Sequence, residues 1–472
     1  MLYNINFFRQ ALKKAFLFSI FLLIPVLVFG SSGSVPSLGP VRVEFIIFGL
    51  LLLGVAVFHN QTFYVALIGF TVILVFKLIF DSGFDLKEHF FGTTPMLEQL
   101  IYKDLRQGEW SIILNLLGLL LGFAVLSKIF EDSRIPDILP RYLPNDWKGP
   151  LFLLVFVFVM SAFLDNIAAA LIGGTVALVV FKHKVHIGYL AALVAASNAG
   201  GAGSVVGDTT TTMMWIDGVS ALNVIHAYIA AVAAFFVFAW IGSHQQDKFH
   251  RIQKNPVRGV KINWTRIIVV IMILIGAILT NVFYDMPALG VWLALGLGVF
   301  IIKVPWKEVP GAMKGTLFLL CLVTSASLMP VEELPGASWV SSLSLGFLSA
   351  VFDNIPLTKL CLDQGHYDWG MLAYAVGFGG SMVWFGSSAG VALTNKFPDA
   401  RDVVMWFRKG WHVAVAYVIG FFALYLIMGW EPADNKEHKV INYPVTGWSY
   451  NEKTHAVTQA LYLPSAGTGN YR

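Results

Sequence analysis

Charged residues are scarce in this chain of 472 residues, because Asp, Glu, Lys and Arg together make up only 13% of it. The net charge of +4 is small for that length, which argues against a nucleic-acid-binding protein. Only two cysteines are present, Cys321 and Cys361, and they form no CxxC pair. Neither a disulfide framework nor a zinc site is therefore indicated, and no bound cofactor is expected.

Apolar residues fill the space that charge leaves. They make up 57% of the chain, and the mean hydropathy is +0.71. Apolar runs recur along the chain at about 20 residues each, long enough to cross about 30 Å of hydrocarbon. The sequence therefore predicts an all-α polytopic membrane protein with about 11 transmembrane segments embedded in a lipid bilayer.

One polar string occurs twice inside this apolar sequence. SAFLDN at residues 161–166 reappears as SAVFDN at residues 349–354. A carboxylate at membrane depth costs about 3 kcal/mol on insertion scales and marks an ion or substrate pathway by default. Two of them, placed alike in the two halves of the chain, indicate a transporter built from repeats.

The segment 244–266 divides the chain into comparable halves. It carries six Lys or Arg residues and one acid, which by the positive-inside rule places it in the cytoplasm. Five parts are predicted: a signal peptide or first transmembrane helix (1–35), a first inverted repeat (36–243), a cytoplasmic basic loop (244–264), a second inverted repeat (265–429) and a polar extracytoplasmic tail (430–472).

Each half contains two interrupted apolar stretches. The Asp-Asn pairs interrupt 150–182 and 338–361, which predicts a re-entrant hairpin in each half. Glycines interrupt 187–220 and 369–396, which predicts two broken helices. Counting spans from the basic loop makes the first hairpin open to the cytoplasm and the second open outward, as in transporters with inverted repeats.

Non-helical backbone at membrane depth survives only where it is buried or lines a water-filled cavity, so the breaks are the candidate site. Primary candidates for binding a cation and a proton are Asp165, Asn166, Asp208, Thr209, Asp353 and Asn354, with Asn198, Thr210, Ser387 and Ser388 as secondary candidates. The helix breaks themselves are assigned to Gly200, Gly201, Gly379, Gly380 and Gly386.

Two ligand classes fit such breaks. Carboxylate and carbonyl oxygens suit a hard cation such as Na⁺ or Li⁺, whereas free N–H groups at the starts of half-helices suit anions. Asp165, Asp208 and Asp353 are expected to converge as the cation ligands, in surroundings of low dielectric that favour the neutral carboxyl group. The deprotonated carboxylates would then bind the cation, and protonation would release it.

Simpler interpretations exist for each of these residues. An Asp near the end of a helix is often only its N-cap. Glycines in membrane helices often serve close packing. Lys359, shortly after the second Asp-Asn pair, either pairs with an acid or extends towards the interface. The repeated context favours the functional interpretation for Asp165 and Asp353.

The motifs as a set resemble those of the NhaD-type sodium/proton antiporters of the ion transporter superfamily. The matching strings are AFLDN (162–166), NAGGA (198–202), GD (207–208) with TTTMMW (210–215), LSA (348–350) with DNIPL (353–357), and GGS (379–381) with GS (386–387) and AGV (389–391). The resemblance implies a scaffold domain, a transport domain that moves like an elevator, a homodimer, and Asp165, Asp208 and Asp353 as residues for Na⁺ or Li⁺ binding and proton exchange.

The sequence departs from that family at two places. Alanines occupy 168–170, where the family tends to carry threonines, and Lys359 is unexpected. The alternative function is a di- or tricarboxylate symporter of the same superfamily. Those relatives carry Ser-Asn-Thr at the hairpin tips, however, and acidic tips repel a carboxylate.

An enzyme is not expected. An intramembrane aspartyl protease would need Gly where Val205 precedes the Gly-Asp pair. The predicted location is the inner membrane of a bacterium, with the C-terminal tail outside the cytoplasm.

Overall fold

The computed structural model describes residues 36–39, 41–58, 61–253, 260–433, 449–451 and 456–458. The chain separates into two units after Asn435. The second unit is described only by the antiparallel strands β3 (Ser449–Asn451) and β4 (Ala456–Thr458). The predicted N-terminal segment 1–35 lies outside the described residues, as does most of the predicted tail 430–472.

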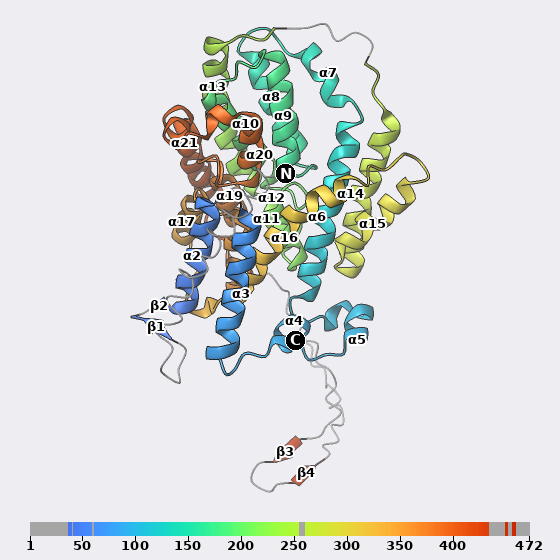
Figure 1. The fold of residues 1–472 in the computed structure, drawn as a ribbon, viewed down its shortest axis with the longest axis vertical. Coiled ribbons are helices and arrows are strands. Elements are labelled where there is room, and N and C mark those ends of the chain that lie inside the picture. Colours follow the sequence, from blue (N-terminus) through green and yellow to red (C-terminus); the bar gives the residue numbers. More distant parts are fainter. Residues whose placement is uncertain are drawn as a thin grey trace, which may run out of the picture. The chain divides into compact units, whose positions relative to one another are not determined.

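The first unit begins with a short strand pair and a helical hairpin, followed by a segment of short helices (Figure 1). Lys77 near the end of the hairpin pairs with Glu44 near its start, at 3.2 Å between Nζ and Oε1. The elements are β1 (Ser37–Leu38), β2 (Val41–Arg42), α2 (Val43–Val57), α3 (Thr62–Phe80), α4 (Leu86–Phe91), α5 (Met96–Ile101) and η1 (Lys103–Leu105).

The first half continues with the predicted interruptions. Helices end and restart around Asp165 and around 202–208, as expected. A short helix with Pro136 in its first turn was not predicted, although proline is tolerated there because the first turn needs no N–H donor. The elements are α6 (Trp110–Glu131), α7 (Ile135–Tyr142), α8 (Lys148–Ser161), α9 (Asn166–Val180), α10 (Ile187–Gly201), α11 (Thr209–Ile216), α12 (Ala221–Ile225) and α13 (Ala227–Phe249).

The second half repeats the order of an interrupted pair followed by a broken helix. Helices stop before Asp353 and again at Gly379. The elements are α14 (Trp264–Tyr284), α15 (Pro287–Gly298), α16 (Glu308–Ser327), η2 (Val331–Glu333), α17 (Trp339–Ser349), α18 (Asn354–Gln364), α19 (Trp369–Gly379), α20 (Ser388–Lys396), η3 (Pro398–Arg401) and α21 (Val403–Met428).

The helices are those of an all-α polytopic membrane protein. Six helical stretches in the described part of the chain are long and apolar enough to span a membrane: α3, α6, α12–α13, α14, α16 and α21. The interrupted helices α8 to α11 and α17 to α20 are shorter, because at 1.5 Å per residue none of them alone reaches across about 30 Å. The total of about 11 segments stays a prediction.

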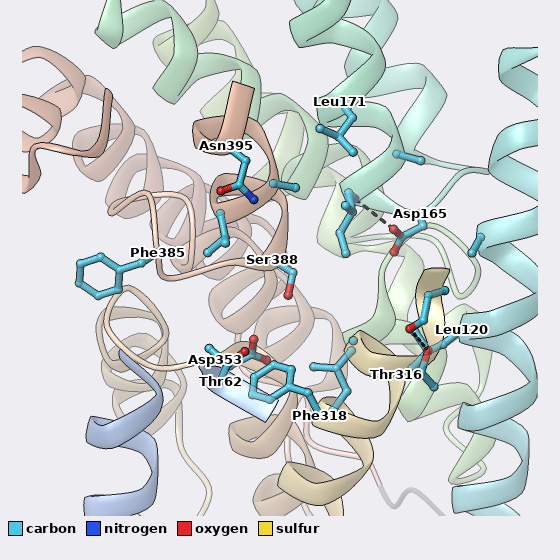
Figure 2. Close-up of a pocket in the computed structure, with 18 of the residues that line it drawn as sticks. Thr62, Leu120, Asp165, Leu171, Thr316, Phe318, Asp353, Phe385, Ser388 and Asn395 are labelled. Carbon is cyan, nitrogen blue, oxygen red and sulfur yellow. Dashed lines mark hydrogen bonds between the residues drawn. The ribbon is translucent and has the colours of Figure 1, made fainter. Parts of the chain in front are cut away.

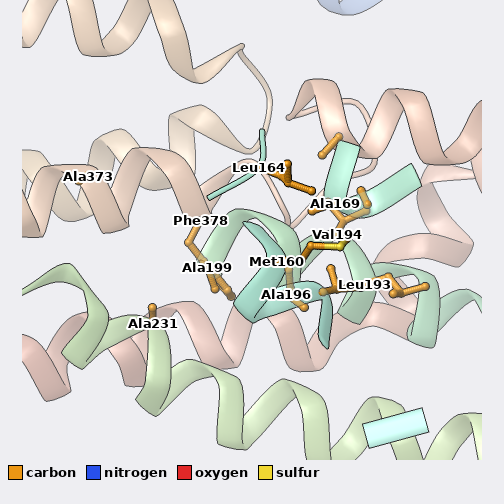
Figure 3. Packing of buried hydrophobic residues seen from close by; sticks show 14 of the residues in the cluster. Met160, Leu164, Ala169, Leu193, Val194, Ala196, Ala199, Ala231, Ala373 and Phe378 are labelled. Atoms are coloured by element: carbon orange, nitrogen blue, oxygen red, sulfur yellow. The ribbon is translucent and has the colours of Figure 1, made fainter. Parts of the chain in front are cut away.

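The two broken helices form the centre of the first unit. Every residue of α19 is buried, and so is every residue of α10 from Gly188 onward. Small side chains such as Ala196 and Ala199 bring α10 close to α8, α13 and α19 (Figure 3). By contrast α14 leaves most of its apolar surface exposed, which suits contact with lipid. The breaks therefore lie in the most enclosed part of the protein.

Candidate functional site

The two hairpin tips have the same local structure. The Asp165 carboxylate accepts a hydrogen bond from the Ile167 N–H at 3.2 Å, which starts α9. The Asp353 carboxylate accepts one from the Ile355 N–H at 3.1 Å, which starts α18. Their backbone angles also match, with φ −50° and ψ 139° for Asp165 and φ −57° and ψ 139° for Asp353. Both acids therefore cap helices, and each does so with one oxygen.

A serine just before each tip fastens it to the neighbouring broken helix. The Ser161 hydroxyl donates to the carbonyl of Ser197 at 2.5 Å, and the Ser349 hydroxyl donates to the carbonyl of Val376 at 2.7 Å. The two serines lie 188 residues apart, and the two acceptors lie 179 residues apart. These are also the offsets between the two Asp-Asn pairs and between the two glycine breaks.

Glycine allows each broken helix to touch the helix that leads to a tip. A Cβ on Gly200 would lie 2.0 Å from the carbonyl oxygen of Phe158 on α8. A Cβ on Gly379 would lie 2.2 Å from the carbonyl oxygen of Gly346 on α17. No side chain fits at either distance, so close backbone contact is the physical reason for glycine at both positions.

The turns within the broken helices are also closed by glycine contacts. A Cβ on Gly201 would lie 2.7 Å from the carbonyl oxygen of Gly207. A Cβ on Gly380 would lie 2.6 Å from the carbonyl oxygen of Gly386. The assignment of these glycines to the breaks agrees with this geometry, because each pair brings the two ends of one break together.

The residues that follow the breaks differ in chemistry although their backbones match. Asp208 precedes α11 with φ −139° and ψ 142°, and Ser387 precedes α20 with φ −138° and ψ 150°. The Ser387 hydroxyl caps its helix by accepting from the Gly390 N–H at 3.2 Å. The Asp208 carboxylate does not cap α11 in this way. It is directed instead towards the first hairpin.

A buried polar network joins the first hairpin to both broken helices. The Asn166 amide donates to Asp208 Oδ1 at 2.8 Å and to Asn198 Oδ1 at 3.1 Å. The Asn198 amide donates in turn to the Ser381 hydroxyl at 2.9 Å. Asp208 is 1% exposed, so this carboxylate is held by protein groups rather than by bulk water. Sequence reasoning did not single out Ser381, since it follows the second glycine pair without any polar repeat.

The network belongs to one half only. At the offset of 179 residues, Asn198 corresponds to Gly377 and Asp208 to Ser387. A Cβ on Gly377 would lie 3.0 Å from Asp208 Oδ2, so the second half leaves room for the carboxylate of the first. Two halves of similar backbone therefore form a site with one central carboxylate.

Asp165 and Asp353 line one cavity of about 470 Å³, which we call the site cavity. Figure 2 shows the two carboxylates reaching it from different helices, with Ser388 and Asn395 of α20 also on its wall. Most of the remaining wall is apolar and includes Phe318 and residues of α2, α6 and α16. Asp208 is not part of this wall, since it lies behind Asn166.

A second cavity of about 460 Å³ continues from the first. The two share Ala124 and Ser127 of α6 and two residues of α9, and the second ends at Lys128, Glu131 and Lys396. We call this second cavity the vestibule. A third cavity beyond it shares Lys128 and Glu131 and is also lined by Arg134, Lys261 and Arg266, in segments that the sequence places in the cytoplasm. The site therefore opens towards the predicted cytoplasmic side.

The remaining predicted residues are buried around the breaks. Thr209 and Thr210 lie in the first turn of α11, at 8% and 0% exposure, and Asn354 starts α18 at 5% exposure. Among the described residues, no three His, Cys, Asp or Glu side chains stand close enough together to hold a metal ion. The expected convergence of three carboxylates into one compact ligand set therefore does not occur in this conformation.

Comparison with known protein families adds an independent observation. A family model described as "Citrate transporter" matches residues 64–379, which is more than half of the chain. The chain belongs to this citrate transporter family. The match includes both hairpin tips and Asp208, so the motifs of the site lie within the family's core. A transporter rather than an enzyme is therefore indicated.

Individual relatives carry more specific names. The chain is 26% identical to sodium/proton antiporter 1 of Arabidopsis thaliana, over 59% of this chain and 55% of that protein. It is 27% identical to the Na(+)/H(+) antiporter NhaD of Vibrio cholerae, over 64% of this chain and 75% of the relative. A 46 kDa membrane protein of Mycobacterium leprae is 24% identical over 71% of this chain and 92% of its own length.

These relatives confirm the resemblance to NhaD-type antiporters that the motifs predicted. The match spans only about half the length of the first Arabidopsis relative, 55% of it. What that whole protein carries is therefore treated as a proposal for this chain.

Proposed function

We propose that this protein exchanges Na⁺ or Li⁺ for H⁺ across a membrane, with Asp165, Asp208 and Asp353 taking up cation and proton alternately. The observation that carries this proposal is the site cavity, into which two carboxylates from opposite halves of the chain project. The names of the Arabidopsis and Vibrio relatives support it.

The chemistry of the proposed exchange follows from burial. An ionised carboxylate away from water must be neutralised by a cation, a proton or hydrogen-bond donors. A hard cation takes oxygen ligands, and the cavity wall offers the carboxylates of Asp165 and Asp353 beside the Ser388 hydroxyl. A proton and a metal cation compete for the same carboxylate oxygens, so uptake of one releases the other.

Asp208 would act as the coupling acid behind the cavity. Its Oδ1 accepts from Asn166, the neighbour of Asp165 in sequence, and Asn166 also contacts Asn198. A change in the charge of Asp208 would therefore alter the hydrogen bonds at the first hairpin tip. In this way the network could report the protonation of a deeply buried group to the cation site.

The wider architecture proposed here is a pair of inverted repeats with elevator-like movement in a homodimer. The matching contacts of Ser161 with Ser349 as their counterpart, and of Gly200 with Gly379 as theirs, support the duplication. The vestibule supports a state that is open to the cytoplasm. We place the protein in the inner membrane of a bacterium, with its tail outside the cytoplasm.

A di- or tricarboxylate symporter is the alternative. The family description favours it, and so do the N-termini of α9, α11, α18 and α20 around the breaks, because helix N-termini attract anions. Acidic residues occupy three of these four N-termini, however, at Asp165, Asp208 and Asp353. They would repel a carboxylate substrate, so cation exchange ranks first.

A flux experiment distinguishes the two functions. Purified protein is placed in proteoliposomes with an acid-loaded lumen and a pH-sensitive dye, and Na⁺, Li⁺, K⁺, citrate or succinate is added, the anions as choline salts. We expect Na⁺ or Li⁺ to make the lumen more alkaline, since the entering cation drives protons out. Empty liposomes and K⁺ serve as controls. A response to citrate or succinate without any response to Na⁺ or Li⁺ would overturn the proposal in favour of the symporter.

A further inference from the structure

A buried lysine lies on the half-helix that begins at the second tip. Lys359 of α18 is 1% exposed, and its Nζ lies 2.7 Å from Asp363 Oδ1 and 2.9 Å from Glu109 Oε1. Asp363 is one turn further along the same helix. Glu109 instead immediately precedes α6, 250 residues away in the sequence. The Lys359–Glu109 ion pair therefore joins a helix that carries a site residue to a helix that spans the membrane.

The position of Glu109 along α6 is informative. α6 has 22 residues, so its two ends are about 33 Å apart. Lys128 and Glu131 at its end line the vestibule, and Leu120 and Phe123 in its second half line the site cavity. Glu109 precedes its first residue. The vestibule and the Lys359–Glu109 pair thus lie at opposite ends of one membrane-spanning helix.

Other charged groups gather at the same end. α11 and α18 are in contact, and each starts at a site acid and reaches another acid at its far end, Asp217 and Asp363 respectively. His89 of α4 also lies close by, with its Nε2 3.2 Å from the Ser327 hydroxyl. The end of the pathway opposite the vestibule is therefore closed by an ionic cluster with Lys359 at its centre.

We propose that the Lys359–Glu109 ion pair is a latch that closes the transport pathway opposite the vestibule and breaks when the site opens on that side. Lys359 then acts as a positioning residue for α18, the helix capped by Asp353. This inference rests on the proposed transport function. It adds a residue for which neither the cation site nor the proton coupling has a use.

The geometry of the pair allows it to open and close. Separating a buried ion pair is costly when it leaves a charge without a partner. Here Lys359 would keep Asp363, which lies on its own helix and would move with it. Glu109 has a side chain that is 15% exposed and would turn to water. Each partner therefore has a second way of being stabilised once the latch is broken.

The test follows the exposure of the site from the two sides of the membrane. A reporter, Ala168→Cys, is placed on the wall shared by the site cavity and the vestibule, in a Cys321→Ser and Cys361→Ala background. A membrane-impermeant maleimide is added from one side or the other of vesicles of known orientation. We expect Lys359→Met to raise labelling from the side opposite the vestibule, relative to labelling from the vestibule, by about fivefold or more.

Glu109→Gln is the second variant, since its partly exposed side chain makes a folding defect less of a concern. It should shift labelling in the same direction. The double variant should shift it no further than Lys359→Met alone, because both changes remove one interaction.

The chain offers a matched control pair. Lys77 is also a largely buried lysine with one acid four residues on, Asp81 at 3.0 Å, and one on another helix, Glu44 at 3.2 Å. Its partners lie within the α2–α3 hairpin and its C-terminal end, so Lys77→Met should lower stability without shifting the labelling ratio. An equal shift in Lys77→Met and Lys359→Met, or no shift in Lys359→Met and Glu109→Gln, would overturn the latch.

The latch and the proposed function fail separately. Labelling that shifts as expected in a protein without Na⁺- or Li⁺-driven proton movement would keep the latch and refute the antiporter. Normal exchange with unshifted labelling would keep the antiporter and refute the latch.

Discussion

Asp208→Asn is expected to lower Na⁺- or Li⁺-driven proton movement by about 100-fold or more, the scale of losing a group that takes up and releases a proton. The substitution removes the charge and little else. Asn is as good an N-cap residue as Asp, so the start of α11 is preserved. The amide oxygen of the new side chain can still accept from Asn166, which now holds Asp208 Oδ1 at 2.8 Å.

The matched control is Asp402→Asn. Asp402 is exposed and caps α21 by accepting from the Met405 N–H at 2.9 Å, so it has the same position in its helix without burial or a network. Its exchange rate should equal that of the unmodified protein, and both variants should melt at nearly the same temperature. Exchange at an unchanged rate in a folded Asp208→Asn protein would remove Asp208 from the coupling.

The helix breaks could be predicted from the sequence because their causes are local. Asp165 and Asp353 each cap the helix that starts one residue later, and this effect reaches only two residues along the chain. Gly200 and Gly379 stand out because glycine pairs followed by a polar residue are rare inside apolar helices. The bounds of α9, α10, α18 and α19 therefore agree closely with the predicted interruptions.

The connections between the breaks could not be predicted in this way. The bond from Asn198 to Ser381 joins residues 183 apart, and the pair of Lys359 and Glu109 joins residues 250 apart. Hydrophobic period and capping motifs carry no information on such distant contacts. The sequence analysis could say only that Lys359 would pair with an acid or extend outward. It could not foresee that Asp208 would lie behind the cavity wall.

Gly200→Ala and Gly379→Ala are expected to destabilise the protein by similar amounts, about 1–3 kcal/mol or more each. Each Cβ would lie about 2 Å from a backbone carbonyl oxygen, at 2.0 Å from Phe158 and 2.2 Å from Gly346. Backbone cannot move aside as a flexible side chain can, so α8 must separate from α10 in one variant and α17 from α19 in the other. Thermal unfolding in detergent, followed by the loss of the monodisperse peak, measures both losses.

Gly296→Ala separates this steric effect from the general effect of replacing glycine in a helix. A Cβ on Gly296 of α15 would meet nothing within 4 Å, and alanine is the better helix former by about 1 kcal/mol, so stability should stay equal or rise. The comparison also bears on the duplication. If the two halves share one packing solution, Gly200→Ala and Gly379→Ala must be harmful together. A large loss at Gly200 with none at Gly379 would mean that only the half carrying Asp208 depends on this close contact.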